Sequence, residues 1–91
     1  MMRYDFRWNI WNTQHIAVHG IGTPDAEFVV CHARRPYPRK IGDGKYLVVG
    51  QAADGRYCQV IYVFDPDAAV FIIHARPLND VEKRRYRRSK T

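Results

Sequence analysis

The sequence predicts one α+β domain, in which two helices precede an antiparallel sheet of three to four strands and a basic helix ends the chain. The chain has 91 residues, of which 46% are hydrophobic, enough for a single domain with a modest core. Three runs between residues 45 and 76 are rich in Val, Ile, Tyr and Phe, as strands are. Because no repeat or change of composition divides the chain, residues 1–91 are predicted to form one domain.

Two helices are predicted before residue 32. Asn9 can cap the first helix, and Gly20 follows its last turn. Thr23 is a suitable N-cap for the second, with Pro24 at the first helical position. The side chains of the second helix that are predicted to pack inward are Phe28, Val29 and Cys31.

The sheet follows a predicted loop. Residues 34–45 carry two prolines and two glycines, which oppose regular structure. Asp54-Gly55 is a tight-turn signal between the first two apolar runs. The predicted strands cover residues 45–52, 56–64 and 69–76, with residues 3–6 as a further edge strand.

A last helix is predicted from residue 80 to residue 88. Pro77 ends the preceding strand, because proline lacks an N–H for the ladder. Asn79 offers an N-cap, and Glu82 stands three residues later, as in a capping box.

The charge of the chain predicts a polyanionic partner. Fifteen Lys and Arg residues against nine Asp and Glu give a net charge of +6, which favours RNA, DNA, an acidic protein or an anionic membrane. No apolar run approaches the roughly 20 residues that span a bilayer, and the N-terminus lacks the apolar region of a signal peptide. A cytoplasmic protein without a membrane partner is therefore expected. The candidate RNA-binding residues are Arg34, Arg35, Arg39 and Lys40 in the loop and Lys83, Arg84, Arg87 and Arg88 in the last helix.

Strand alternation predicts that His74 and Arg76 are neighbours on one face of the sheet, together with Val70 and Ile72. RNA cleavage by 2′-hydroxyl attack needs a proton shuttle and a cation for the developing phosphorane charge. Histidine suits the first role and arginine the second. A structural alternative stays open, in which Arg76 anchors the C-terminal helix through a carboxylate and His74 is simply half-buried.

The remaining motifs exclude several chemistries. His15 and His19 are spaced to share a metal ion, but no H-E-x-x-H motif or nearby acidic ligand supports a metal site. The two histidines are expected to pack against the sheet or to bond loop carbonyls. No glycine-rich phosphate loop, nucleophile elbow or cysteine-pair motif is present, so no cofactor is expected. Five tyrosines offer surfaces for base stacking, although several belong in the core: Tyr37, Tyr46, Tyr57, Tyr62 and Tyr86.

Three stretches together resemble the BrnT-type toxin family over nearly the whole chain. "WNIWNTQHIAVHGIGTPDAEFVV" resembles the N-terminal region of that family, with its His-Gly signal after the first helix. "GKYLVVGQAADGRYCQVIYVF" resembles its central hairpin with a Gly-Arg turn. "FIIHARPLNDVEKRRYRR" resembles its closing strand and helix, and is the most specific part.

This resemblance implies a RelE-like fold and a bacterial ribonuclease toxin. It also implies a cognate antitoxin that represses their shared operon, with a homo-oligomer or a toxin–antitoxin heterotetramer as the assembly. By motif position, Arg76 matches the functional arginine at the strand end, and Lys45 stands where relatives usually carry an arginine. Gly44 replaces the usual acidic residue, so His74 or Asp43 would have to supply an acid or base.

Two functions are therefore expected for the chain. The first is a metal-independent RNA endonuclease, in which Arg76 and Lys45 stabilise phosphate and His74 shuttles a proton. The alternative is a non-catalytic RNA- or protein-binding module that kept the fold, which the missing acid at Gly44 motivates.

Overall fold

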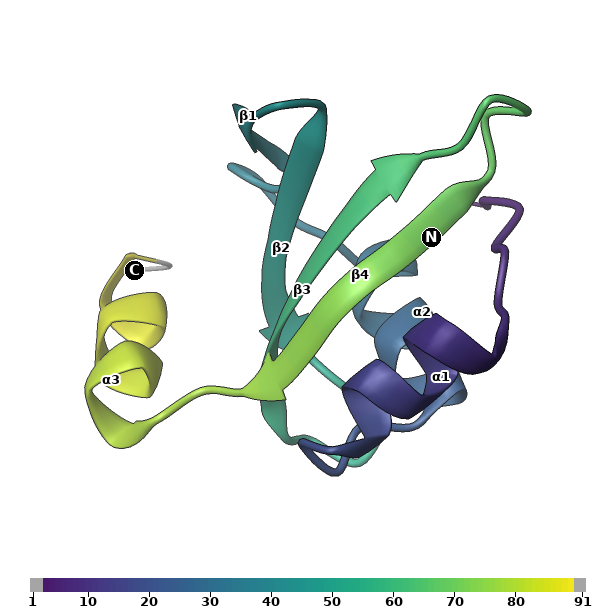
Figure 1. Cartoon of the computed structure of the whole chain (residues 1–91). Coiled ribbons are helices and arrows are strands. Elements are labelled where there is room, and N and C mark those ends of the chain that lie inside the picture. The colour runs from purple at the N-terminus through teal and green to yellow at the C-terminus, as the bar shows by residue number, and fades with distance from the viewer. Residues whose placement is uncertain (1–2, 90–91) are drawn as a thin grey trace.

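A computed structural model describes residues 3–89 as an α+β domain built on one antiparallel sheet (Figure 1). The strands follow one another in the order β1-β2-β3-β4, so the predicted fold class is confirmed. The elements are α1 (Ile10–Ala17), α2 (Thr23–Cys31), β1 (Arg39–Gly42), β2 (Lys45–Gln51), β3 (Tyr57–Phe64), β4 (Val70–Pro77) and α3 (Asp80–Ser89). None of the helices in this range has the length and apolarity that crossing a membrane requires.

The core lies between the sheet and the first two helices. Figure 1 shows α1 and α2 together on one side of the sheet, whereas α3 stands apart from them. Of the α2 side chains predicted to pack inward, Val29 is buried, but Phe28 and Cys31 are only half-buried. The largest buried aliphatic and aromatic side chains of the core are Ile16, Ile21, Val29, Val30, Val48, Val60, Tyr62, Val70 and Ile72.

Both N-terminal helices are capped by side chains, one as predicted and one a residue earlier. The Asn9 side chain accepts the N–H of Asn12 at 3.1 Å, and the Asn12 side chain accepts the N–H of Asn9 at 2.8 Å. The predicted cap of α2 at Thr23 is wrong, because Gly22 is the N-cap. Asp25 Oδ2 accepts the Gly22 N–H at 3.1 Å, which satisfies a donor at the helix start.

The segment predicted as a loop contains β1, which pairs with β2 and brings the sheet to four strands. Asp43 and Gly44 have φ of 54° and 72°, and Gly42 pairs with Lys45 across them. Positive φ at both central residues is the type I′ hairpin turn, which connects strands with the natural sheet twist. Residues 3–6, expected as an edge strand, make only an isolated bridge through Phe6 to Val70.

A β-bulge in β4 changes the face on which its side chains lie. The register shifts between Ile61 and Tyr62 of β3, which pair with His74 and Ile72, so Ile73 is the extra residue. Val70 and Ile72 are buried in the core, whereas His74 and Arg76 lie on the other face. The prediction that all four share a face is therefore wrong, but His74 and Arg76 remain neighbours.

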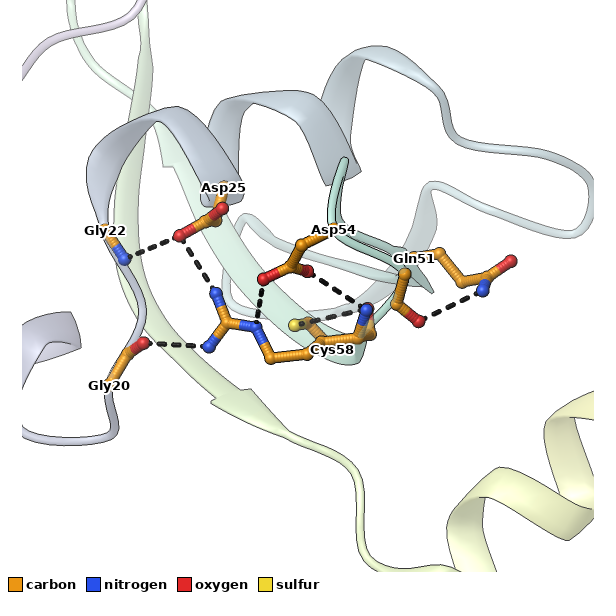
Figure 2. A network of polar contacts seen from close by, with 8 residues as sticks. Gly20, Gly22, Asp25, Gln51, Asp54 and Cys58 are labelled. Carbon is orange, nitrogen blue, oxygen red and sulfur yellow. Dashed lines mark hydrogen bonds and ion pairs between the residues drawn. The ribbon is translucent and has the colours of Figure 1, made fainter.

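Arg56 joins the turn between β2 and β3 to the loop between α1 and α2. Its guanidinium donates to Asp54 at 2.7 Å, to the Gly20 carbonyl at 3.0 Å and to Asp25 at 3.1 Å. Figure 2 shows Asp25, Asp54 and the Gly20 carbonyl converging on this network. Because Gly20 directly follows His19, the network fixes the turn after α1 in which this histidine lies.

The predicted capping box at the start of α3 is confirmed. The Glu82 N–H donates to the Asn79 side chain, and the Asn79 N–H donates to Glu82 Oε1, both at 2.9 Å. Two otherwise unpaired donors at the helix start are satisfied in this way. The same pair of bonds holds the Glu82 carboxylate close to the end of β4.

Candidate functional site

Three histidines gather where α1 meets β4. His15 lies on α1, and His19 lies four residues later in the turn that follows the helix. Their ring centroids lie 6.4 Å and 5.7 Å from that of His74, which the bulge in β4 turns away from the core. This histidine cluster (His15, His19 and His74) brings two predicted sheet-packing residues against a predicted catalytic one.

Trp11 covers one side of the histidine cluster. Its ring stacks on His15 at 4.9 Å with an interplanar angle of 10°, and on Phe71 at 6.1 Å with an angle of 13°. Flat stacking of this kind restricts the orientation of the His15 ring. Trp11 itself is 54% exposed, so the cluster lies at the surface rather than in the core.

The environment of His74 favours its neutral form. Burial lowers the pKa of this imidazole below its ordinary value of 6.5, and the nearby His19, Arg76 and His15 lower it further. Loss of water penalises the charged ring, and neighbouring positive charges repel a further proton. A neutral imidazole at neutral pH can accept a proton, which is the role of a general base.

Among the described residues, neither the histidine cluster nor any other group of histidines, cysteines and carboxylates has the arrangement of a metal site. Across residues 3–89, no group of three such side chains has the arrangement that would hold a metal ion.

Arg76 is held in place by Glu82. Nη1 and Nη2 donate to the two carboxylate oxygens at 2.8 Å and 2.7 Å, and Nη2 also donates to Gln59 Oε1 at 3.2 Å. The arginine bonds and the Asn79 N–H lower the pKa of Glu82 to about 2. Arg76 therefore makes the anchoring contact to α3 that was left open as a structural alternative, while its guanidinium stays partly exposed beside His74.

Lys45 lies far from Arg76. It begins β2 next to the Asp43-Gly44 turn, whereas Arg76 is level with Val49 near the opposite end of β2. Four strand residues separate the two levels by about 13 Å, and two strand spacings add about 10 Å across the sheet. His74 and Arg76 thus form a neighbouring pair, and Lys45 is remote from Arg76, whereas His74, level with Leu47, is two strand residues and two strands from Lys45.

The predicted RNA-binding residues lie in two groups. Arg34, Arg35, Arg39 and Lys40 follow α2 and enter β1, and the remainder lie on α3. Most are exposed, whereas Lys83 is half-buried and lies 3.8 Å from Asp80. Two of the arginines contact tyrosines: Arg39 lies 5.3 Å from the ring centre of Tyr37, and Arg87 lies 5.4 Å from that of Tyr57. Each of the two groups therefore has one arginine beside an aromatic ring.

Sequence reasoning missed the partners that long-range contacts supply. His15 and His19 gave a signal in their helical spacing, but only the fold brings them to His74. Glu82 gave a signal as part of the capping box, yet its bonds to Arg76 depend on the path of residues 77–79. The shallow pockets beside Tyr86 have no local sequence signal at all.

Comparisons with known proteins assign no family to this chain. The chain matches no family model, no curated protein and no solved structure. What stands is a compact α+β domain with two N-terminal helices, a four-stranded antiparallel sheet and a C-terminal helix. The chemistry of the histidine cluster, of Arg76 and of the basic groups is therefore the basis for inferring a function.

Proposed function

We propose that this protein is a metal-independent RNA endonuclease that uses His74 to move a proton. The observation that carries the proposal is the position of His74, within 5.7 Å and 6.4 Å of two further imidazoles and two residues from Arg76. Its lowered pKa supports the role, because a general base must be neutral when substrate binds.

The proposed reaction needs one base and one acid. His74 takes the proton of the 2′-hydroxyl, whose oxygen attacks the adjacent phosphorus and forms a 2′,3′-cyclic phosphate. An exposed imidazole, His15 or His19, gives a proton to the departing 5′-oxygen, so that all atoms and charges balance. Arg76 stabilises the charge that develops on the phosphorane oxygens. Two imidazoles in opposite protonation states are sufficient for both transfers.

The cellular role follows from the resemblance to BrnT-type toxins. We propose a cytoplasmic toxin that inhibits growth by RNA cleavage and is neutralised by a cognate antitoxin. Lys45 is assigned to RNA binding rather than to the reacting phosphate, since it lies two strands from His74 and near the opposite end of β2 from the level of Arg76. Co-expression with a small neighbouring gene that restores growth would identify the antitoxin.

Cleavage can be tested directly with purified protein. Natural single-stranded RNA is incubated with the protein in excess chelator, and the products are analysed for cyclic phosphate ends. His74→Gln is expected to abolish cleavage while keeping RNA affinity, and Lys45→Gln is expected to retain the chemical step. Full-length RNA at high protein concentration, together with normal growth on expression, would reject the endonuclease.

A non-catalytic RNA-binding module is the second candidate. The bidentate contact between Arg76 and Glu82 favours it, because that contact occupies the guanidinium edge that a phosphate would need. Such a module would bind RNA with an affinity that falls steeply with salt, and the bound RNA would stay intact.

A further inference from the structure

We propose that two adjacent pockets, separated by Tyr86, bind two successive unpaired nucleotides of single-stranded RNA. The proposal rests on the proposed RNA function for the class of ligand, and it adds the place and the manner of binding. The first pocket has a volume of about 350 Å³ and the second about 290 Å³, and Tyr86 lines both. These volumes are near the lower end of the range for small-molecule sites, as expected for a single nucleotide.

The first pocket offers two aromatic rings to a base. Tyr37 precedes β1 and Tyr86 lies on α3, and their ring centroids are 6.5 Å apart with an angle of 38°. A base stacked between two rings needs about 7–8 Å, twice the contact distance of carbon atoms. The two rings therefore need to separate by about 1 Å to admit a base between them.

Polar groups of the first pocket suit the remainder of a nucleotide. Arg39 and Arg85 line it and can bind phosphate. Gln59 uses its Oε1 to accept from Arg76, which leaves its amide N–H groups to donate to a base carbonyl. Glu82, also in the wall, is neutralised by its ion pair with Arg76. The pocket thus combines stacking, a base-edge donor and two cations.

The second pocket, on the other side of Tyr86, offers aromatic rings and one arginine. Phe28 and His32 stack on each other at 3.9 Å and line the pocket together with Arg34. Gly50 and Gln51 of β2 form its floor. A ring between two bases doubles their usual separation of about 3.4 Å, so neighbouring nucleotides reach both pockets when Tyr86 lies between them.

The site lies beside the part of β2 that β1 does not pair with. β1 pairs with β2 only as far as Leu47, so in the described chain residues 48–51 have no strand beside them on that edge. A Cβ added at Gly50 would lie 4.0 Å from the Tyr86 hydroxyl, which shows how closely α3 approaches this edge. The tyrosine covers the open edge and forms the wall between the two pockets.

Single-stranded RNA fits these walls better than an acidic peptide does. Paired aromatic rings match the flat faces of bases, whereas carboxylates need only the cations. A duplex keeps its bases stacked inside and cannot place them in either pocket. The ligand is therefore a flexible segment, and the adjacent Arg76 and His74 would meet the phosphates that follow it.

Binding is measured with a fluorescent oligonucleotide of about eight nucleotides, within the usual length of such sites. Its sugars carry 2′-O-methyl groups, so 2′-hydroxyl attack cannot cleave it. Tyr86→Leu is expected to weaken binding about tenfold or more, the usual loss for one stacked base. Tyr37→Leu and Arg39→Gln are expected to weaken it several-fold without affecting α3.

Matched controls come from the same chain. Phe64→Leu removes an exposed aromatic ring at the far end of the sheet, and Arg3→Gln removes a positive charge from an exposed residue outside both basic groups. Both are expected to bind as the unaltered protein does. Melting curves of each variant separate a lost contact from a displaced helix.

The outcomes distinguish this inference from the proposed function. Weaker binding in the three pocket variants, with both controls unchanged, supports the site whether or not natural RNA is cleaved. Equal losses in Arg39→Gln and Arg3→Gln with no effect of the tyrosines would overturn it in favour of a diffuse basic surface. Equal affinity for duplex RNA, or displacement by polyglutamate at matched charge, would also overturn it even if the enzyme cleaves RNA.

Discussion

The contact between Arg76 and Glu82 shows how one side chain serves both fold and site. The guanidinium joins the end of β4 to the first turn of α3 through two short bonds. Their side chains are 31% and 27% exposed, which puts the pair between a surface ion pair and a buried one. The energy of the pair should therefore lie between the two limits, and its geometry leaves Arg76 within two residues of His74.

Arg76→Ala is expected to lower the free energy of unfolding by roughly 1–3 kcal/mol, between the values for exposed and buried pairs. For a domain of this size the melting temperature should fall by at least about 5 °C. Lys45→Gln is the control, because this exposed lysine should leave the melting temperature nearly unchanged. Equal melting temperatures for Arg76→Ala and the unaltered protein would show that the contact between Arg76 and Glu82 does not stabilise the fold.

His74 should make stability depend on pH. Its folded-state pKa lies below 6.5, so the unfolded chain takes up the proton first as the pH falls. Stability is therefore fully present above about pH 6.5 and is lost progressively below it. The loss of melting temperature between about pH 7.5 and pH 5.5 should be smaller in His74→Gln, which cannot titrate.

His15 and His19 are present in both proteins of this comparison, so the difference between the two proteins reports on His74. Parallel melting curves over this pH range, with the same slope in both proteins, would contradict a lowered pKa of His74.

At the scale of elements, the sequence predicted most of the helices and strands but not β1. Residues 39–42 were assigned to a loop because prolines and glycines surround them. The signal for β1 was nevertheless present, since Asp43-Gly44 is the preferred dipeptide of a type I′ turn. The bulge at Ile73 had no such signal, because a register shift depends on the facing strand.

Gly44 should be required for the β1–β2 hairpin. Its φ of 72° lies in the left-handed region, which costs an L-residue roughly 1–2 kcal/mol. Gly44→Ala and Gly44→Glu are both expected to lower the free energy of unfolding by about 1 kcal/mol, whereas Asp43→Asn should be nearly neutral. Urea denaturation of the four proteins measures the difference.

Gly44→Glu also tests whether the acidic residue that is missing at position 44 matters for RNA cleavage. It restores the acidic residue expected from the resemblance, but three strand residues and two strands away from His74. No gain in RNA cleavage is therefore expected. A large gain would move the reaction centre to the Lys45 end of the sheet.

At the scale of the molecule, the sequence predicted the fold class because the helix caps, apolar runs and turn signals agreed with one another. It predicted the pairing of His74 with Arg76, since residues two apart in a strand share a face whether or not a bulge precedes them. The contacts of His74 with α1, and the pockets on either side of Tyr86, depend on segments far apart in the chain. No local pattern specifies such contacts.

The two basic groups should act together as one RNA-binding surface. If each contacts phosphate, Arg35→Gln and Arg84→Gln should each flatten the plot of log affinity against log salt by about 0.7, the value per phosphate for single strands. Arg3→Gln is the matched control, because it removes the same charge from an exposed residue outside both groups. Its slope should equal that of the unaltered protein. Equal flattening in all three variants would mean that net charge alone attracts RNA, without a defined path across β1 and α3.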